Sequence, residues 1–143
     1  MDASIQFHKA DVRFRLLKQN ELRMWLVSVA KKEGFKVESI NIILCSDEYL
    51  YQVNVSYLKH KTYTDIITFD YSQRKSPLSG ELYISIERVM DNADNLGIKA
   101  SEEFHRVMVH GVLHLCGYGD KTASDKALMR KKEDFYLSLR KFI

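Results

Sequence analysis

Apolar residues recur along the chain with two different spacings, which predicts helices and strands in alternation. The three- and four-residue spacing through 20–32 predicts a helix, with Asn20 as its N-cap. A β-branched run predicts a buried strand over 39–45, and a β-branched and aromatic run predicts another over 64–71. Strict alternation of apolar and polar residues predicts a third strand over 81–87.

Capping residues and helical spacing predict four further helices. Ser46 precedes two acidic residues and begins one of them, and a short helix later in the chain ends at Gly97. Ser101 is the expected cap of a helix that runs to about Cys116, and Thr122 begins a last helix that reaches nearly to the C-terminus. This order predicts an α/β (α+β) fold, in which helices pack on a small mixed sheet of about four strands.

Composition is consistent with one soluble globular domain spanning residues 1–143. Of the 143 residues, 45% are apolar and 29% are charged, and the one proline, Pro77, gives no sign of a linker. No apolar run approaches the roughly 18 residues of a membrane span, and the first residues do not form a secretory signal. Two isolated cysteines, Cys45 and Cys116, are too few for a disulfide framework. We therefore expect a cytoplasmic protein whose thiols are reduced.

The formal net charge of +3 is unevenly distributed along the chain. Basic residues outnumber acidic ones in 1–36 and in 121–143, whereas acidic residues dominate 37–120. This distribution suits a metal site flanked by a surface that attracts anions. Ordinary solvated helix faces would give the same distribution.

The predicted helix that ends near Cys116 carries a pair of histidines on a mostly apolar background. His110 and His114 are four residues apart, so both imidazoles project from one face and can bind one metal ion. Gly117 ends the helix, and the chain that turns back there can bring Asp120 as a third ligand. Three protein ligands leave a coordination position open for water, as in catalytic metal sites. The same histidine spacing also occurs by chance, and Asp120 could simply be a turn residue.

The spacing of these residues also invites comparison with zincin-like peptidases. Those enzymes need a glutamate directly after the first histidine, where it acts as the general base. In this chain that position is Gly111. A peptidase therefore remains only a weaker alternative.

Four segments, in order along the chain, carry a resemblance to a known family. Residues 110–118 match His-Gly-x-Leu-His-Leu-x-Gly-Tyr at every fixed position, and 64–69 resembles a Thr-Asp-Val-Leu-Ser-Phe strand. Residues 53–57 resemble a Leu-Asn-x-x-Tyr segment, and 80–85 resembles the strand that follows. In these segments the chain is similar to the YbeY family of metal-dependent, single-strand-specific endoribonucleases.

The resemblance implies a function and a set of partners. A member of this family would hydrolyse phosphodiesters of single-stranded RNA during 16S rRNA maturation and ribosome quality control, in the cytoplasm. It would bind ribosomal RNA and the ribosome or its small subunit, with no role for DNA or a membrane. Its cofactor would be one divalent ion, expected to be Zn²⁺, held by His110, His114 and Asp120. The alternative is a ribosome-associated RNA-binding factor in which the metal is largely structural.

Two departures from the family pattern favour that alternative. The third metal ligand of the family is usually histidine, whereas this chain has Asp120, preceded by Gly119 instead of aspartate. An oxygen ligand is compatible with zinc, but its negative charge weakens the metal as a Lewis acid. The family usually has arginine where this chain has Leu58. The cations nearest to it in sequence are Lys59, His60 and Lys61.

Further residues are candidates for binding RNA and for catalysis. The basic residues expected to bind the phosphate backbone are Lys59, Lys61, Arg74 and Lys75. Tyr57 and Tyr118 are candidates for stacking on unpaired bases. His60 and Glu81 are the candidate general bases. Asp65 and Glu81 lie at polar strand positions, from which either could orient a ligand histidine or form a plain hydrogen bond in the sheet.

Overall fold

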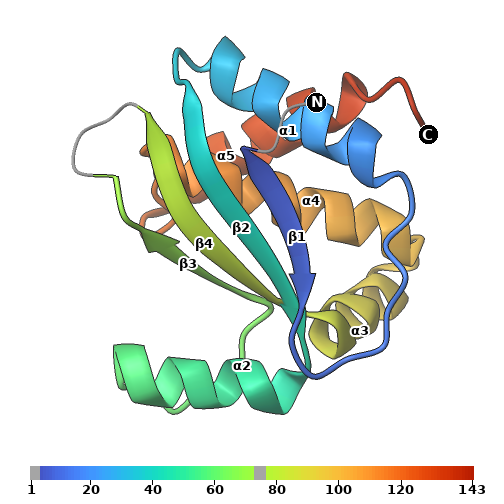
Figure 1. The fold of residues 1–143 in the computed structure, drawn as a ribbon, viewed down its shortest axis with the longest axis vertical. Coiled ribbons are helices and arrows are strands. Elements are labelled where there is room, and N and C mark those ends of the chain that lie inside the picture. The colour runs from blue at the N-terminus through green and yellow to red at the C-terminus, as the bar shows by residue number, and fades with distance from the viewer. Residues whose placement is uncertain (1–3, 73–76) are drawn as a thin grey trace.

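A four-stranded mixed sheet forms the centre of the molecule (Figure 1). The computed structural model describes residues 4–72 and 77–143. Its strands are β1 (Ile5–Lys9), β2 (Val37–Cys45), β3 (Ile66–Asp70) and β4 (Leu78–Ser85), in the spatial order β1-β2-β4-β3. The pairs β1–β2 and β2–β4 are parallel, whereas β3 runs antiparallel to β4 at the edge of the sheet. The mixed α/β fold expected from the sequence is therefore confirmed.

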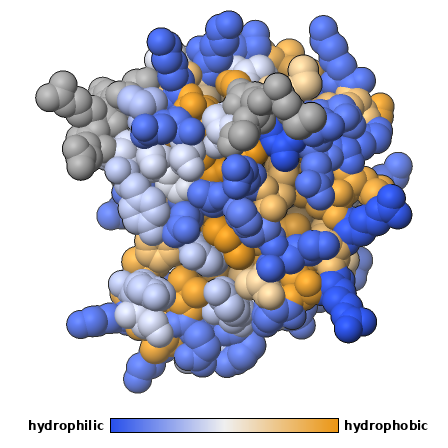
Figure 2. Space-filling view, in the orientation of Figure 1, coloured by the Kyte–Doolittle hydropathy of each residue, from blue (hydrophilic) through white to orange (hydrophobic). Residues whose placement is uncertain are grey.

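The described residues form five α-helices, which lie on one face and at one end of the sheet. They are α1 (Gln19–Lys32), α2 (Asp47–Val53), α3 (Ile86–Leu96), α4 (Ala100–Leu115) and α5 (Ala123–Ser138). Helices α1 and α4 lie against one face of the sheet, α5 packs on α4, and α2 lies at one end of the strands (Figure 1). The opposite face, seen in Figure 2, is mostly polar with apolar side chains interspersed. Within the described residues, no helix has the length and apolar character that a bilayer span requires.

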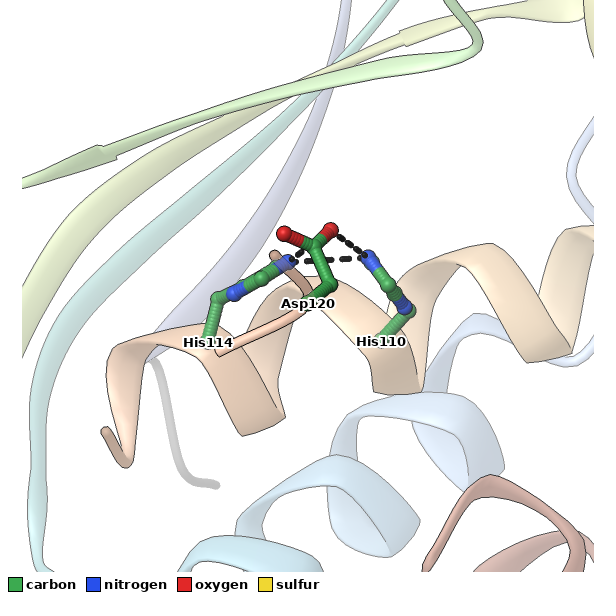
Figure 3. A group of neighbouring side chains, drawn as sticks. All are labelled: His110, His114 and Asp120. Atoms are coloured by element: carbon green, nitrogen blue, oxygen red, sulfur yellow. Dashed lines mark hydrogen bonds and ion pairs between the residues drawn. The ribbon is translucent and has the colours of Figure 1, made fainter. Parts of the chain in front are cut away.

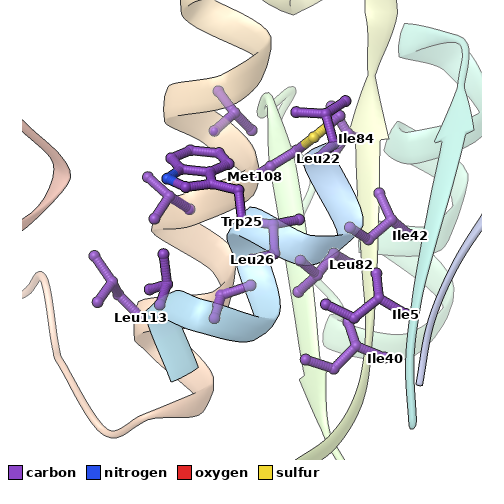
Figure 4. Close-up of a cluster of buried hydrophobic side chains, with 14 of the residues drawn as sticks. Ile5, Leu22, Trp25, Leu26, Ile40, Ile42, Leu82, Ile84, Met108 and Leu113 are labelled. Atoms are coloured by element: carbon purple, nitrogen blue, oxygen red, sulfur yellow. The ribbon is translucent and has the colours of Figure 1, made fainter. Parts of the chain in front are cut away.

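The main hydrophobic core lies between the sheet and helices α1 and α4 (Figure 4). The side chains that meet there and are fully buried include Leu22, Leu26, Ile40, Ile42, Leu82, Ile84, Met108 and Leu113. Alternate residues of β2 and β4 point into this layer, as the period of a strand requires. Burial of each such side chain contributes about 1.5–3 kcal/mol, so this layer fixes α4, the helix of the histidine pair, on the sheet.

The strands differ from the prediction in number and in limits. Strand β2 begins at residue 37 instead of 39, and β3 covers 66–70 where 64–71 was predicted. The sequence did not predict β1, because only Ile5 of its five residues is buried and the alternation is too weak to detect. Strand β4 covers 78–85, where 81–87 was predicted. The Ser85 hydroxyl accepts a hydrogen bond from the Arg88 N–H, so Ser85 caps α3 and ends the strand two residues early.

Helix starts agree with the prediction at two caps and differ at two. Ser46 and Thr122 each accept a hydrogen bond from the N–H three residues ahead and cap α2 and α5, as predicted. The predicted caps Asn20 and Ser101 are wrong, because both lie inside their helices. Helix α1 follows Lys18, which adopts a left-handed conformation with φ 59°. Neither start uses a side-chain cap, so no capping residue marks them in the sequence.

A π-helical turn, η1 (Asn54–Leu58), extends α2 towards β3. The Asn54 side chain is buried, and its Nδ2 donates to the backbone oxygen of Thr62 at 2.8 Å. This hydrogen bond holds the loop between η1 and β3 against the end of the turn. The loop carries His60, and its position decides how His60 lies relative to α4.

Candidate metal centre

Two histidines and one aspartate converge beside α4 (Figure 3). The Nε2 atoms of His110 and His114 are 2.9 Å apart. Asp120 Oδ2 lies 3.1 Å from Nε2 of His114 and 3.6 Å from Nε2 of His110. All three side chains are partly buried, and their ligand atoms lie within 4.8 Å of one another. These are the three ligands that the sequence predicts.

The end of α4 explains how Asp120 reaches the two imidazoles. Gly117 adopts φ +106°, a left-handed conformation that glycine tolerates without strain. The N–H of Gly117 donates to the carbonyl of His114, and the N–H of Tyr118 donates to that of Leu113. This pair of hydrogen bonds is a Schellman motif, which reverses the chain at the end of a helix. The reversal returns Asp120 to the histidine face of α4.

A hydrogen bond at Nδ1 fixes the orientation of each imidazole. Nδ1 of His114 lies 2.8 Å from the carbonyl oxygen of Tyr118, and Nδ1 of His110 lies 2.6 Å from Oε2 of Glu133 on α5. A carbonyl oxygen can only accept, so Nδ1 of His114 carries the proton. Burial opposes ionisation of Glu133, but hydrogen bonds from His110 and Arg106 outweigh it and hold the pKa of its carboxyl below the ordinary value. Glu133 is therefore an acceptor as well.

The donor arrangement fits a bound divalent ion. With both Nδ1 atoms protonated, the two neutral imidazoles direct unprotonated Nε2 lone pairs towards each other at 2.9 Å. A cation shared by the two nitrogens, either a proton or a metal ion, satisfies this arrangement. A tetrahedral ion with Zn–N bonds of 2.0–2.1 Å would place the two nitrogens about 3.3 Å apart, close to the observed separation. Two imidazoles and a carboxylate are also a donor set that zinc accepts.

Negative charge around His110 strengthens that fit. Burial disfavours the charged imidazolium, but Glu133, Asp120 and Asp65 outweigh it and raise the pKa of His110. The same carboxylates favour any cation at this position.

Two hollows meet at the centre. A groove of about 770 Å³ follows β3 and includes Leu58, His60 and Lys121 in its wall. A cavity of about 420 Å³ lies towards α5 and includes Glu103 and Arg130. The residues that line both hollows are Asp65, Ile66, His110 and Asp120. The candidate ligands therefore lie where an extended substrate in the groove would pass.

Of the two candidate general bases, the structure brings one to the groove. His60 is exposed and lines it. Glu81 lines neither hollow, and its carboxylate accepts a hydrogen bond from the hydroxyl of Tyr71 at 2.8 Å. Leu82 packs against Gly111 of α4, so the preceding residue of the strand points to the opposite face of the sheet. The predicted role of Glu81 at the metal centre is therefore corrected.

Asp65 lies beside the centre without holding a histidine. Asp65 is partly buried, and this burial raises the pKa of its carboxyl. The Nδ1 atoms of both histidines are taken by Glu133 and Tyr118, so Asp65 does not orient the ligands as the sequence suggested.

The predicted phosphate-binding cations lie in different places. Lys59 and Lys61 do not line the groove, and Arg74 and Lys75 lie outside the described residues. Apart from the two candidate ligand histidines, the basic residues among the described residues that line the groove are Lys121 and His60. These two are the candidates to replace the arginine whose position is Leu58.

The two stacking candidates differ in accessibility. Tyr57 is exposed, with 73% of its surface open to solvent. Tyr118 is half-buried, and its hydroxyl donates to Glu33 at 2.6 Å. Tyr57 remains accessible to a base, whereas Tyr118 is engaged within the protein.

Sequence reasoning missed three groups: Glu133, Lys121 and the carbonyl of Tyr118. A backbone carbonyl leaves no signal in a sequence. Glu133 does leave one, because it occupies the same helical stripe as the buried residues Met129 and Tyr136. An acidic residue within an apolar stripe indicates a buried partner. Lys121 is adjacent to Asp120, and the turn that positions one positions the other.

Comparison with known proteins indicates the family to which the chain belongs. The family model described as "Endoribonuclease YbeY" matches residues 4–140. A protein named Endoribonuclease YbeY from Cytophaga hutchinsonii is 50% identical over 99% of each chain. Another of that name, from Amoebophilus asiaticus, is 40% identical over 99% of this chain and 96% of its own.

A solved structure gives an independent likeness of the fold. The solution structure of TM1509 from Thermotoga maritima superposes with a TM-score of 0.65 at 24% identity, covering 94% of this chain and 87% of that one.

The match of the family model over nearly the whole chain and the identity to its curated members lead to one conclusion. The chain belongs to the YbeY family.

Proposed function

We propose that this protein is a metal-dependent endoribonuclease that cleaves single-stranded RNA. Its substrate is ribosomal RNA, its roles are 16S rRNA maturation and ribosome quality control, and it acts in the cytoplasm with the small ribosomal subunit as partner. Zn²⁺ is the proposed ion, bound by His110, His114 and Asp120. Family membership supports the reaction class.

The observation that carries this proposal is the paired orientation of the two histidines. Both Nδ1 atoms are held from behind, and both Nε2 atoms face one point at the junction of the groove and the cavity. A divalent ion bound there supplies positive charge that polarises a phosphoryl oxygen and lowers the pKa of water. Outer partners of this kind are typical of functional metal sites.

The groove offers suitable groups for a single strand of RNA. Lys121 provides a positive charge beside the ligands for the phosphate backbone. The Thr62 hydroxyl, whose oxygen accepts from the Asn54 side chain, can donate a hydrogen bond. His60 provides an imidazole in the same wall and is the proposed group that accepts or donates a proton. No sequence-specific contact is required for this form of binding.

The decisive experiment measures cleavage of an end-labelled single-stranded RNA by the purified protein. We expect cleavage that EDTA abolishes and added Zn²⁺ restores, with little cleavage of duplex RNA or single-stranded DNA. The variant H110A/H114A, purified in the same way, is the matched control and should be inactive. Cleavage by this variant, or cleavage that resists EDTA, would point to a contaminating nuclease and contradict the proposal.

The second candidate function is a ribosome-associated RNA-binding factor whose metal is structural. Leu58 in the groove wall, where the family usually has arginine, and the carboxylate ligand Asp120 favour it. Binding of the RNA and of zinc without cleavage would support this alternative.

A peptidase is not favoured by the structure. A Cβ atom at Gly111 would lie 2.8 Å from a methyl group of Leu82, so this position faces the sheet and cannot hold a base at the metal. We expect no hydrolysis of peptide substrates.

A further inference from the structure

Glu33, the residue that ends α1, accepts hydrogen bonds from three side chains. The hydroxyl of Tyr118 donates to Oε1 at 2.6 Å, and the hydroxyl of Tyr136 donates to Oε2. Nζ of Lys132 lies 3.2 Å from Oε2. Only 10% of the Glu33 side chain is exposed, so this carboxylate is an interior junction between α1, the loop after α4, and α5.

The groups that Glu33 joins are next to the groups that hold the two histidines. The backbone oxygen of Tyr118 accepts from Nδ1 of His114, while the side chain of the same residue donates to Glu33. Lys132 and Tyr136 flank Glu133 on α5, and Glu133 is the partner of His110. One carboxylate therefore ties together the two segments that hold the metal ligands from behind.

The junction depends on the negative charge of Glu33. Burial opposes that charge, but the bonds from Tyr118, Tyr136 and Lys132 outweigh burial and lower the pKa of the Glu33 carboxyl. Nζ of Lys132 also lies 5.5 Å from the centre of the Tyr118 ring, which adds a cation–π contact to the same cluster. An uncharged amide would bond more weakly to these donors and would turn its own NH₂ towards at least one of them.

We propose that Glu33 is a positioning residue for the metal centre, acting through Tyr118 on His114 and through α5 on His110. It fixes the loop and α5 relative to each other, so that both imidazoles present Nε2 to one ion. This inference rests on the proposed function only in requiring that the centre binds a metal.

The competing role for Glu33 is purely structural, as a link between α1 and α5. Both roles predict lower stability when the link is lost. Only a positioning role predicts weaker metal binding at temperatures where the variant is fully folded.

The test compares zinc dissociation constants of the full chain, measured by competition with a chromophoric chelator well below the melting temperature. The variants are E33Q, Y118F and E33Q/Y118F. We expect E33Q to raise the dissociation constant about three- to tenfold, less than the 10–100-fold typical of a group bonded directly to a ligand. The double variant should be little worse than E33Q alone, because both changes break one chain of contacts. The visible spectrum of Co²⁺ bound in place of zinc should change in the same variants.

E102Q is the matched control. Glu102 of α4 is another carboxylate that links two segments, since it pairs with Arg140, two residues after α5, through bonds of 2.6 and 2.9 Å. It lines neither hollow of the metal centre. We expect E102Q to lower the melting temperature and to leave the zinc dissociation constant unchanged.

Several outcomes would overturn the inference. Equal zinc affinity in the wild type, E33Q and Y118F would overturn the inference about Glu33 and leave the proposed function standing. A loss of zinc affinity in E102Q as large as that in E33Q would have the same consequence. If E33Q fails to fold, Y118F decides, since it removes a single oxygen atom. A wild type that binds neither zinc nor cobalt would overturn the proposed function and this inference together.

Discussion

At the residue scale, the two nitrogens of each ligand histidine have separate tasks. In both residues Nδ1 donates to a fixed acceptor and Nε2 faces the shared point. A carbonyl holds His114 and a carboxylate holds His110, so the two imidazoles differ in the charge behind them. An imidazole backed by a carboxylate is the more basic ligand.

Loss of both imidazoles should remove the metal. We expect H110A/H114A to contain no stoichiometric zinc when the purified protein is measured by elemental analysis, because Asp120 alone is too weak a ligand. H8A is the control, since His8 is exposed on β1 and its imidazole bonds to the Asn41 side chain, away from the metal centre. Unchanged zinc content in H110A/H114A would exclude the site.

Neutralising Glu133 should weaken the centre without destroying it. In E133Q the amide oxygen can still accept from Nδ1 of His110, but the negative charge is lost. We expect a zinc dissociation constant about 10–100-fold higher, measured by chelator competition. E48Q, a change at an exposed carboxylate on α2, should leave it unchanged. A wild-type constant in E133Q would contradict the role of Glu133.

At the element scale, β3, β4 and α4 meet without space for larger side chains. A Cβ atom at Gly80 would lie 2.5 Å from the backbone oxygen of Phe69 and 2.9 Å from a methyl group of Leu115. At Gly111 the nearest atoms are side-chain ends of Leu82 and Ile66, at 2.8 and 2.9 Å. At Gly80 the nearest atom belongs to the backbone and cannot rotate away. At Gly111 the nearest atoms belong to side chains, which can rotate.

Alanine at these two glycines should therefore have unequal effects. We expect G80A to lower the free energy of unfolding by about 2–3 kcal/mol, near the upper end for overpacking. G111A should cost less, since side-chain rotation relieves the contacts and alanine gains about 1 kcal/mol of helix propensity. Urea unfolding of both variants measures the difference. A G111A loss as large as that of G80A would show that Leu82 and Ile66 cannot adjust.

Sequence reasoning predicted the elements whose signals are local. Gly117, Ser46 and Thr122 ended or began helices as predicted, because each acts through its own backbone or a residue three positions away. It missed β1, which is a strand because it pairs with β2. It also missed Glu133, which reaches His110 from 23 residues further along the chain. What depended on tertiary contacts could not be predicted from local patterns.

At the scale of the whole molecule, a buried histidine makes stability depend on pH. His105 is 8% exposed, and its Nδ1 lies 2.7 Å from Nη1 of Arg140. Burial is the larger cause and the charge of Arg140 the smaller one, and together they lower the pKa of His105 to about 4. The histidine is therefore neutral in the folded protein at pH 5, whereas the unfolded chain binds a proton there.

The sign of the pH dependence follows. Between pH 6.5 and about 4 the unfolded state binds more protons at His105, so the free energy of unfolding falls as the pH falls. The loss amounts to about 1.4 kcal/mol per pH unit, on the order of 3 kcal/mol in all. H105N, whose amide oxygen can replace Nδ1 as acceptor, should flatten this slope in urea unfolding with EDTA present. H8N should keep the wild-type slope, and a wild-type slope in H105N would contradict the assignment.

Three distant segments must come together before the histidines are held in place. Glu33 ends the first helix, Tyr118 follows the fourth, and Glu133 lies on α5, 23 residues after His110. A nascent chain still emerging from the ribosome therefore lacks the hydrogen bond between His110 and Glu133 until α5 has been made and has docked. This order of assembly delays full support of the metal ligands until all three segments are in place.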